Sequence, residues 1–250
     1  YHGLSDWYLA ANLGERKSLD GHLLSGLAPS GVPRALKGTT RTFAYNDIAA
    51  LRRLAKRHHD IGVIVVETMR HEEPQNDFLR KVKRVAKRIG AVLIFDEISI
   101  GFRLTVGGAH LRYGVTPDIA VLGKAMSNGF PCAAVIGKKD VMRAAETSFI
   151  SSTYWSERIG PVAALATIRK MQRVRLPAHL KRIGRMIGEG WERVAKKHGL
   201  ALTVTFTPEA LVSFSFDYGS RSQAVRTLFT QEMLARGFLA GGLGLVERDR

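Results

Sequence analysis

The sequence predicts an α/β fold with a mainly parallel sheet, and three short apolar runs are the main evidence for it. The runs read IGVIVVE, AVLIFDE and DIAVLGK, and most of their positions are apolar. This pattern is typical of strands that are buried on both faces, as in a parallel sheet. The segments between the runs are long enough for crossover helices. Because such crossovers are right-handed, we expect the carboxyl ends of all three strands at one edge of the sheet.

A crossover helix is expected over residues 77–90, whose sequence is DFLRKVKRVAKRIG. Apolar side chains recur there at helical spacing, and Gly90 is suited to end the helix. The apolar stripe comprises Phe78, Leu79, Val82, Val85, Ala86 and Ile89. Basic residues occupy the opposite face, which indicates a helix that packs with one side and exposes the other.

The C-terminal part of the chain has a different pattern. Residues 160–197 predict two helices that are interrupted at LPAH, because Pro177 cannot continue a helix. Two β-rich runs follow in ALTVTFTPEALVSFSF, around a TPE turn. The segment SRSQAVRTLFTQEMLARG then predicts a helix that ends at Gly237. This order of elements indicates the start of a small α+β domain.

Polar residues close the three apolar runs. Glu67 ends the first run, Asp96 lies at the end of the second and Lys124 follows the third. Taken alone, a strand-end acid can be structural and a lysine can be solvated. Together at one edge of an open sheet they indicate a ligand crevice. A buried acid and a buried lysine suit pyridoxal phosphate, because the lysine forms a Schiff base with its aldehyde and the acid keeps its ring nitrogen protonated.

The composition narrows the class of protein. Apolar residues make up 45% of the 250 positions, which suffices for one domain with a substantial core and part of a second. No apolar run approaches the ~18 residues of a membrane span, and no signal peptide is visible. The single cysteine, Cys132, excludes an intrachain disulfide and fits a reducing, cytoplasmic compartment. The eight histidines are scattered, so no metal site is predicted.

The net charge of +16 is concentrated in predicted helices, chiefly at residues 51–59, 79–88 and 169–197. Basic helix faces attract phosphate groups and could bind nucleic acid. However, the sequence holds no recognisable nucleic-acid-binding motif. We therefore predict no nucleic-acid partner, and attraction of anionic substrates is a milder explanation of the charge.

Four segments resemble one known family. FDEISIGFR is similar to the FDEV-x-x-GFR segment of class III aminotransferases, a fold-type-I pyridoxal-phosphate group that also includes glutamate-1-semialdehyde aminomutase. LGKAMSNGFPCAAVIGKKDVM resembles the segment that carries the family's lysine. YHGLSDWYLA resembles its aromatic-His-Gly segment, and ISSTYWSERIGPVAALATI its threonine-bearing loop and following helix. The resemblance extends from Tyr1 to about residue 175 and more faintly to residue 240.

The resemblance implies roles for three residues around the cofactor ring. Lys124 is the lysine that forms the Schiff base with pyridoxal phosphate and then moves the proton between the substrate and the cofactor. Asp96 pairs with the ring nitrogen, since a nearby negative charge raises that nitrogen's proton affinity. Ile98 corresponds to the family's valine, which packs on one face of the ring.

The resemblance also implies contacts at the opposite ring face and at the phosphate. Tyr1 and His2 are expected beside the ring, with the aromatic ring of Tyr1 stacked on it. Thr153 is expected to reach the cofactor phosphate of the neighbouring subunit, and Ser151 and Ser152 are alternatives for this role. The active unit implied is therefore a homodimer.

Two positions depart from the family pattern. Glu67 lies in VVETMRHEEPQ, where the family usually has Glu-Pro-Val, and we expect it at the substrate end of the crevice. Ser99 stands where many members carry a glutamine that bonds the phenolic oxygen of the cofactor. Its shorter side chain is expected to need a bridging water there.

The implied organisation is a fold-type-I large domain over residues 1–159, incomplete at its N-terminus. Interdomain helices and part of a small C-terminal domain are expected over residues 160–250. Chains of the family are commonly much longer than 250 residues, so we expect a fragment that lacks the N-terminal loop for the cofactor phosphate.

The implied reaction moves an amino group between a small-molecule amino donor and a keto or aldehyde acceptor. An intramolecular aminomutase of the glutamate-1-semialdehyde type shares every residue named above, so this alternative stays open. A non-catalytic remnant of the fold that binds the cofactor poorly is the second alternative.

Overall fold

The computed structural model describes the chain except for residues 1, 4, 15–17, 20–26, 155 and 241–250. It comprises two compact units. The first consists of Tyr1–Met69 with Pro74–Lys170, and the second of Arg70–Glu73 with Met171–Arg250.

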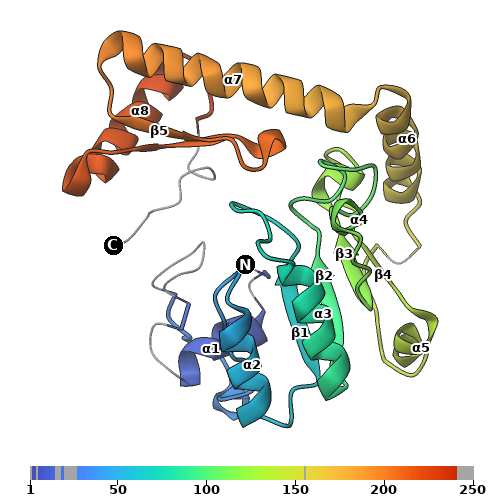
Figure 1. The fold of residues 1–250 in the computed structure, drawn as a ribbon. Coiled ribbons are helices and arrows are strands. Elements are labelled where there is room, and N and C mark those ends of the chain that lie inside the picture. The colour runs from blue at the N-terminus through green and yellow to red at the C-terminus, as the bar shows by residue number, and fades with distance from the viewer. Residues whose placement is uncertain (1, 4, 15–17, 20–26, 155, 241–250) are drawn as a thin grey trace. The chain divides into compact units, whose positions relative to one another are not determined.

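A four-stranded sheet forms the centre of the first unit (Figure 1). Its strands in spatial order are β1 (Val63–Glu67), β2 (Val92–Asp96), β3 (Ile119–Leu122) and β4 (Ala134–Gly137). The first three are parallel, and β4 runs antiparallel to β3. The mainly parallel sheet predicted from the three apolar runs is therefore confirmed.

The predicted crossover helix is α3 (Phe78–Ile89), and it is confirmed. It ends at Gly90, which has a left-handed φ of 74° and so takes a conformation that favours glycine. Helix α2 (Ile48–Arg57) packs beside α3, and the Asp47 side chain caps it by accepting a 2.8 Å hydrogen bond from the Ala50 amide.

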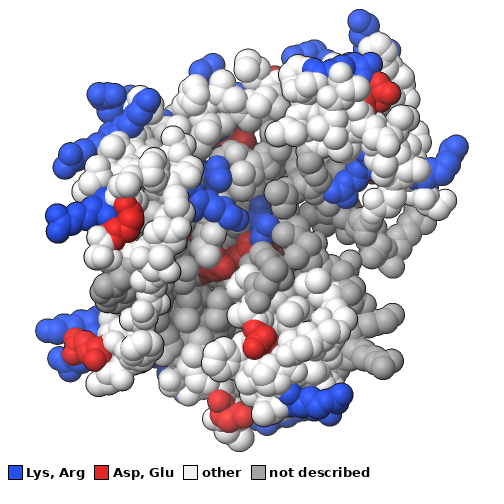
Figure 2. Space-filling model, turned by 180° about the vertical axis from the view of Figure 1, so that it is seen from behind, with Lys and Arg blue, Asp and Glu red and all other residues white. Residues whose placement is uncertain are grey.

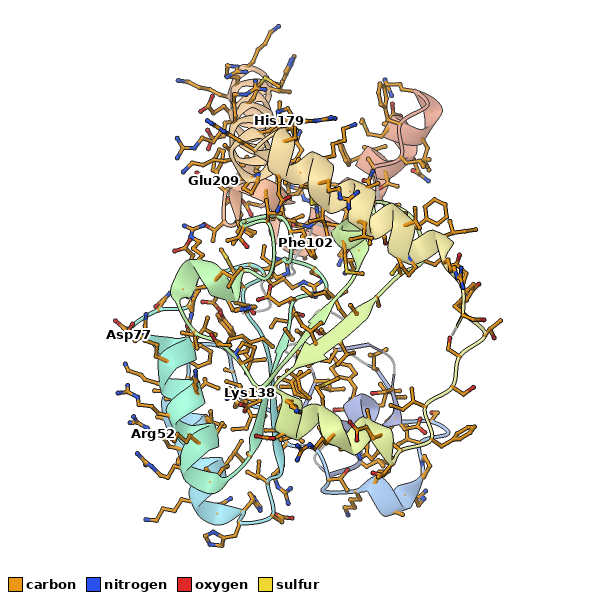
Figure 3. The ribbon with its side chains drawn as sticks, turned by 90° about the vertical axis from the view of Figure 1, so that its right-hand side faces the viewer. Arg52, Asp77, Phe102, Lys138, His179 and Glu209 are labelled. Atoms are coloured by element: carbon orange, nitrogen blue, oxygen red, sulfur yellow. The ribbon has the colours of Figure 1, made fainter. Side chains whose placement is uncertain are left out.

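The core of the first unit lies between these two helices and one face of the sheet. Its buried members come from α2, α3, β1 and β2, with one residue just before β2 and one before β3. They are Leu51, Ile64, Val66, Phe78, Leu79, Val82, Val85, Ala86, Ala91, Leu93, Phe95 and Val115. The basic side chains of α2 and α3, including Arg52, project away from this core (Figure 3).

Burial of both faces was expected for every strand, and this expectation is wrong for β1. Val63 and Val65 are 51% and 39% exposed, whereas Ile64 and Val66 are buried in the core. Successive side chains of a strand point to opposite faces, and helices α2 and α3 cover only the face with Ile64 and Val66.

Short elements complete the first unit. They are α1 (Asp6–Gly14), η1 (Arg34–Leu36), α4 (His110–Tyr113), η2 (Lys124–Met126), α5 (Lys139–Met142) and η3 (Arg143–Glu146). Helix α6 (Ile159–Arg173) begins in the first unit and ends in the second.

The second unit contains α7 (Leu176–His198), the antiparallel strands β5 (Leu202–Thr205) and β6 (Ser213–Phe216), and α8 (Ser222–Ala235). Two short turns of helix, η4 (Glu209–Leu211) and η5 (Gly219–Arg221), lie before β6 and α8. The predicted strand–turn–strand–helix order is present.

The break between α6 and α7 precedes the position expected for it. Pro177 lies in the first turn of α7, and the chain turns at Arg175, whose φ is 49°. Proline is tolerated in a first helical turn because the amide there has no helical partner. Pro177 therefore belongs to the start of α7, and the prediction that it interrupts the helices is wrong.

Two glycines let α7 approach its neighbours in the second unit. A Cβ at Gly184 would lie 1.7 Å from the Glu209 backbone oxygen, and one at Gly188 would lie 2.3 Å from the Phe206 ring. Glu209, labelled in Figure 3, also accepts a hydrogen bond from Arg185 Nε (2.9 Å) and forms an ion pair with Lys181 (3.3 Å). The α7–η4 contact therefore combines close backbone packing with charge pairing.

The chain has 38 Lys and Arg residues against 22 Asp and Glu residues, and both kinds of side chain are visible on the face drawn in Figure 2. No helix in the described part of the chain combines the length and the apolar character needed to cross a membrane. Within the same residues, no group of three or more His, Cys, Asp and Glu side chains could hold a metal ion.

Candidate functional site

The carboxyl ends of β1, β2 and β3 lie together at one edge of the sheet. Glu67, the last residue of β1, is in register with Asp96, the last residue of β2. Asp96 is in turn in register with Val121 of β3, and Lys124 begins the turn of helix that follows β3. The convergence of Glu67, Asp96 and Lys124 expected from the crossover rule is present in the sheet.

Asp96 is buried and held by two donors. Its side chain is within 2.8 Å of the His2 ring nitrogen Nδ1, and it accepts a hydrogen bond of 3.0 Å from the Ile98 amide. Burial raises the pKa of Asp96, but the hydrogen bonds from His2 and Ile98 outweigh burial and hold this pKa below its ordinary value of 3.8. Asp96 is therefore an anion at neutral pH.

Lys124 takes a backbone conformation that is unusual for a lysine. Its φ is 45°, in the left-handed region. Its Nζ donates a 2.7 Å hydrogen bond to the Ser99 hydroxyl, which belongs to the loop after β2. The expectation of a buried lysine is wrong, because Lys124 is exposed: it lies beyond the end of β3, at the rim of the sheet.

Ile98 and Ser99 lie next to this lysine, as expected of a shared site. Both side chains are half-buried, and a Cβ at Gly123 would lie 3.7 Å from Ile98 Cγ2. Ile98 therefore packs close to the backbone that leads into Lys124. The site thus combines an ionised acid, an amine and an apolar side chain within two strand ends.

The predicted phosphate contact, Thr153, is not joined to this edge of the sheet. Thr153 lies in the exposed segment between η3 and α6, and Ser151 and Ser152 are exposed beside it. In the described part of the chain, no hydrogen bond or ion pair links Thr153 to Asp96 or Lys124. Tyr1 lies outside the described residues.

Three neighbouring residues did not emerge from the sequence. Glu97 is fully buried and bonds Thr68 and His110, and Thr68 follows Glu67 directly. The adjacent acids of FDE were the available signal, because neighbours on a strand point to opposite faces. An acid on the buried face requires donors, but the sequence does not reveal which residues supply them.

Comparison with known proteins gives a consistent result. A profile of the family described as Aminotransferase class-III matches residues 1–240. The 3-aminobutyryl-CoA aminotransferase of Cloacimonas acidaminovorans is 30% identical over 243 residues, covering 94% of this chain and 55% of that protein. A glutamate-1-semialdehyde 2,1-aminomutase of Roseiflexus castenholzii is 32% identical over 255 residues, covering 95% of this chain and 57% of that protein.

The same likeness holds for the backbone. An omega-transaminase from Sphaerobacter thermophilus matches with a TM-score of 0.76 at 24% identity, covering 96% of this chain and 59% of the other. This match confirms the predicted fold. The chain spans 55% and 57% of the length of the two curated relatives above, so it corresponds to about half of each.

Proposed function

Because this chain belongs to the class III aminotransferase family, we propose that it binds pyridoxal phosphate and transfers an amino group from a small-molecule donor to a keto or aldehyde acceptor. Residues 1–159 are assigned to the cofactor-binding large domain, and residues 160–250 to interdomain helices and part of the small domain. The observation that carries the proposal is that the ionised Asp96 ends β2 and Lys124 follows the neighbouring strand β3, with the Lys124 amine bonded to Ser99 of the loop after Asp96.

The residues at the strand ends fit the cofactor ring. A ring nitrogen retains its proton only beside a stable negative charge, and the lowered pKa of Asp96 provides that charge at neutral pH. The two donors to Asp96, His2 and the Ile98 amide, also fix the direction of its carboxylate. Ile98 offers an apolar surface beside Gly123, which suits one face of an aromatic ring.

Lys124 would hold the cofactor by a bond from its Nζ to the aldehyde carbon of pyridoxal phosphate. When bound, pyridoxal phosphate withdraws electrons from the amino-bearing carbon of the substrate. Once the substrate amine has displaced it, Lys124 Nζ would take the proton from that carbon and deliver it to the former aldehyde carbon of the cofactor, while Asp96 would keep the ring nitrogen protonated. The hydrogen bond to Ser99 holds the amine at the rim, where a substrate can approach from solvent.

Glu67, Tyr1 and His2 are assigned to the surroundings of the reacting groups. Glu67 lies in register with Asp96 on the neighbouring strand, which supports a place at the substrate end of the crevice. His2 contacts Asp96, and this contact supports a place for His2 beside the cofactor ring. Tyr1 is assigned from the family resemblance alone.

We assign the active unit to a homodimer in which Thr153 of one chain reaches the phosphate at the Lys124 site of the other. The segment around Thr153 supports this, because Phe149, Ile150 and Tyr154 are 97%, 54% and 62% exposed. Large apolar side chains that gather on one segment mark interaction surfaces. Light scattering is expected to give twice the mass of one chain, and a monomer that retains the cofactor would contradict this assignment.

Transfer between two molecules and transfer within one use the same residues in this chain. Both relatives named above are family members, one an aminotransferase and the other an aminomutase. A cytoplasmic reaction is proposed for both, and the free cysteine Cys132 supports a reducing compartment. Incubation with each isomer of a diamino or semialdehyde substrate, without a second acceptor, distinguishes the two reactions. Conversion of one isomer to the other indicates transfer within one molecule, whereas a requirement for an added acceptor indicates transfer between two.

The cofactor's attachment provides the main test. The chain is mixed with pyridoxal phosphate, reduced with borohydride and analysed by peptide mass spectrometry. We expect the label on Lys124 and an absorption change when an amino donor is added. Lys124→Ala should lose both signals, whereas the control Lys138→Ala, which removes an ion pair with Asp118, should keep them. A chain that takes up no cofactor would overturn the proposal in favour of a non-catalytic remnant.

A further inference from the structure

Glu97 has a fully buried carboxylate immediately after Asp96. One oxygen, Oε1, accepts hydrogen bonds from the Thr68 hydroxyl at 2.7 Å and from the His110 amide and His110 Nδ1, both at 2.9 Å. The other, Oε2, accepts a hydrogen bond of 2.7 Å from the Ala109 amide. Four donors therefore surround one carboxylate.

A carboxylate with four donors holds the segments that carry these donors in fixed positions. A buried carboxylate that lacks donors strongly destabilises the folded state. Movement of any of the four donors away from Glu97 is therefore unfavourable, and the donors stay in fixed positions. The donors come from two segments that are far apart in the sequence: Thr68 follows the end of β1, and His110 begins α4. Thr68 is itself fully buried, and its backbone oxygen accepts a 2.7 Å hydrogen bond from Tyr45.

The loop of residues 98–108 begins and ends at this carboxylate. It starts with Ile98 and Ser99, the two residues that lie next to Lys124, and it closes where Ala109 bonds Glu97. The closure is tight, because a Cβ at Gly108 would lie 3.1 Å from Glu97 Oε1 and 2.3 Å from the His110 ring. The path of the loop is thus tied to one buried side chain.

We propose that Glu97 is a positioning residue for Asp96 and Ser99: its buried contacts with Thr68 and His110 fix the strand end and the loop that present these two groups to the cofactor. The inference rests on the proposed function for what Asp96 and Ser99 contact. Glu97 is fully buried among these donors and is not assigned any contact with cofactor or substrate.

Glu97→Gln is the main test. Glutamine keeps the size and one acceptor oxygen, but its NH₂ group replaces Oε2 and opposes the Ala109 amide. The loop must then shift, and a misplacement of ~1 Å at reacting groups reduces turnover on the order of a hundredfold. We expect kcat to fall by that factor, the KM of the amino donor to change little, and the absorption spectrum of the bound cofactor to change.

A second readout does not depend on the cofactor. The Ile98 amide donates to Asp96, so its hydrogen exchange in the cofactor-free protein reports directly on the strand end. Exchange at Ile98 should speed up in Glu97→Gln. If the wild type binds no cofactor, the proposed function fails, but this measurement still decides whether Glu97 positions Asp96.

Asp118→Asn provides the matched control. Asp118 also joins strands through its carboxylate, since it accepts hydrogen bonds from the Leu93 amide (2.9 Å) and Lys138 (2.6 Å). It lies just before β3, at the opposite edge of the sheet. The Asp118→Asn variant should be less stable than the wild type, but its kcat, cofactor spectrum and hydrogen exchange at Ile98 should be unchanged. Glu97→Gln behaving like Asp118→Asn would overturn the inference.

A pair of His110 variants keeps the inference testable if Glu97→Gln fails to fold. His110→Asn can place an N–H donor near the position of Nδ1, whereas His110→Phe keeps a ring and removes the donor. We expect the asparagine variant to retain most of the wild-type turnover and Ile98 protection, and the phenylalanine variant to lose both. Equal behaviour of the two variants would contradict a role for the carboxylate contact.

Discussion

Lys124 and Ser99 are joined by a hydrogen bond of 2.7 Å between the amine and the hydroxyl. This bond links the turn after β3 to the loop after β2. Since Ser99 lies three residues beyond Asp96, the amine and the acid of the site are anchored on the same short loop. A shift of that loop therefore changes the position of both groups together.

Asp96→Asn is expected to slow amino transfer strongly. Asparagine keeps the shape and one hydrogen bond, but it cannot stabilise a positive charge on the ring nitrogen. Loss of a charge-assisted bond of about 3 kcal/mol corresponds to a roughly hundredfold decrease in kcat. The measurement is single-turnover kinetics at saturating cofactor. Asp96→Glu should recover part of the rate, and an asparagine variant as fast as the wild type would show that the acid is structural.

Thr153→Ala is expected to weaken retention of the cofactor more than its chemistry. The change removes one proposed phosphate contact of about 1.5 kcal/mol and leaves the ring site intact, so Kd for the cofactor should rise roughly tenfold. Equilibrium dialysis measures this change. The control is Thr147→Ala, which removes another exposed hydroxyl in the preceding turn and should leave Kd unchanged. Equal Kd values for both variants would contradict the role of Thr153.

Asp118→Asn is expected to change the dependence of stability on acid pH. Burial raises the pKa of Asp118, but the Lys138 amine and the Leu93 amide outweigh burial and hold it below 3.8. A lowered folded-state pKa stabilises the folded protein above the unfolded value, and this stabilisation disappears as the pH falls through the folded value. It should amount to about 1 kcal/mol or less, because solvent screens the pair with Lys138.

Urea unfolding at several pH values tests this expectation. The free energy of unfolding should be lower for Asp118→Asn than for the wild type above pH 3.8, the ordinary value of the carboxyl. The two curves should converge at lower pH. A difference between them that is independent of pH would show that Asp118 acts through its shape alone.

Gly184→Ala is expected to destabilise the second unit. The new Cβ would lie 1.7 Å from the Glu209 backbone oxygen, so α7 and η4 must separate. Overpacking of this kind costs about 1–3 kcal/mol, which urea unfolding can measure. The matched control is Gly190→Ala in the same helix, where the nearest atom is the flexible end of Arg193 at 3.8 Å. The control should be neutral or slightly stabilising, and equal losses in both variants would refute close packing at Gly184.

The strand ends were predictable because their signals are local. Each apolar run and the polar residue that closes it are contiguous, and the handedness of crossovers then brings Glu67, Asp96 and Lys124 to one edge. The exposure of Val63 was not predictable in the same way, because burial of a strand's second face depends on what packs against it.

The hydrogen bonds to Glu97 could not be predicted from local sequence patterns. Its donors lie 29 residues earlier, at Thr68, and 13 residues later, at His110. Neither spacing is a motif, and the contacts exist only once β1, β2 and α4 are packed. The role of Pro177 depends on a related feature: whether a proline breaks a helix or begins one is decided by where the preceding residues turn.

The left-handed backbone at Lys124 sets stability against chemistry at one position. An L-residue with a side chain costs about 1–2 kcal/mol in this conformation relative to glycine. A sequence that is no longer selected for catalytic activity would therefore gain stability if glycine replaced this lysine. Its presence makes residue 124 a sensitive indicator of ancestry: in a descendant of this chain that has abandoned amino transfer, this lysine should be among the first residues of the sheet edge to disappear.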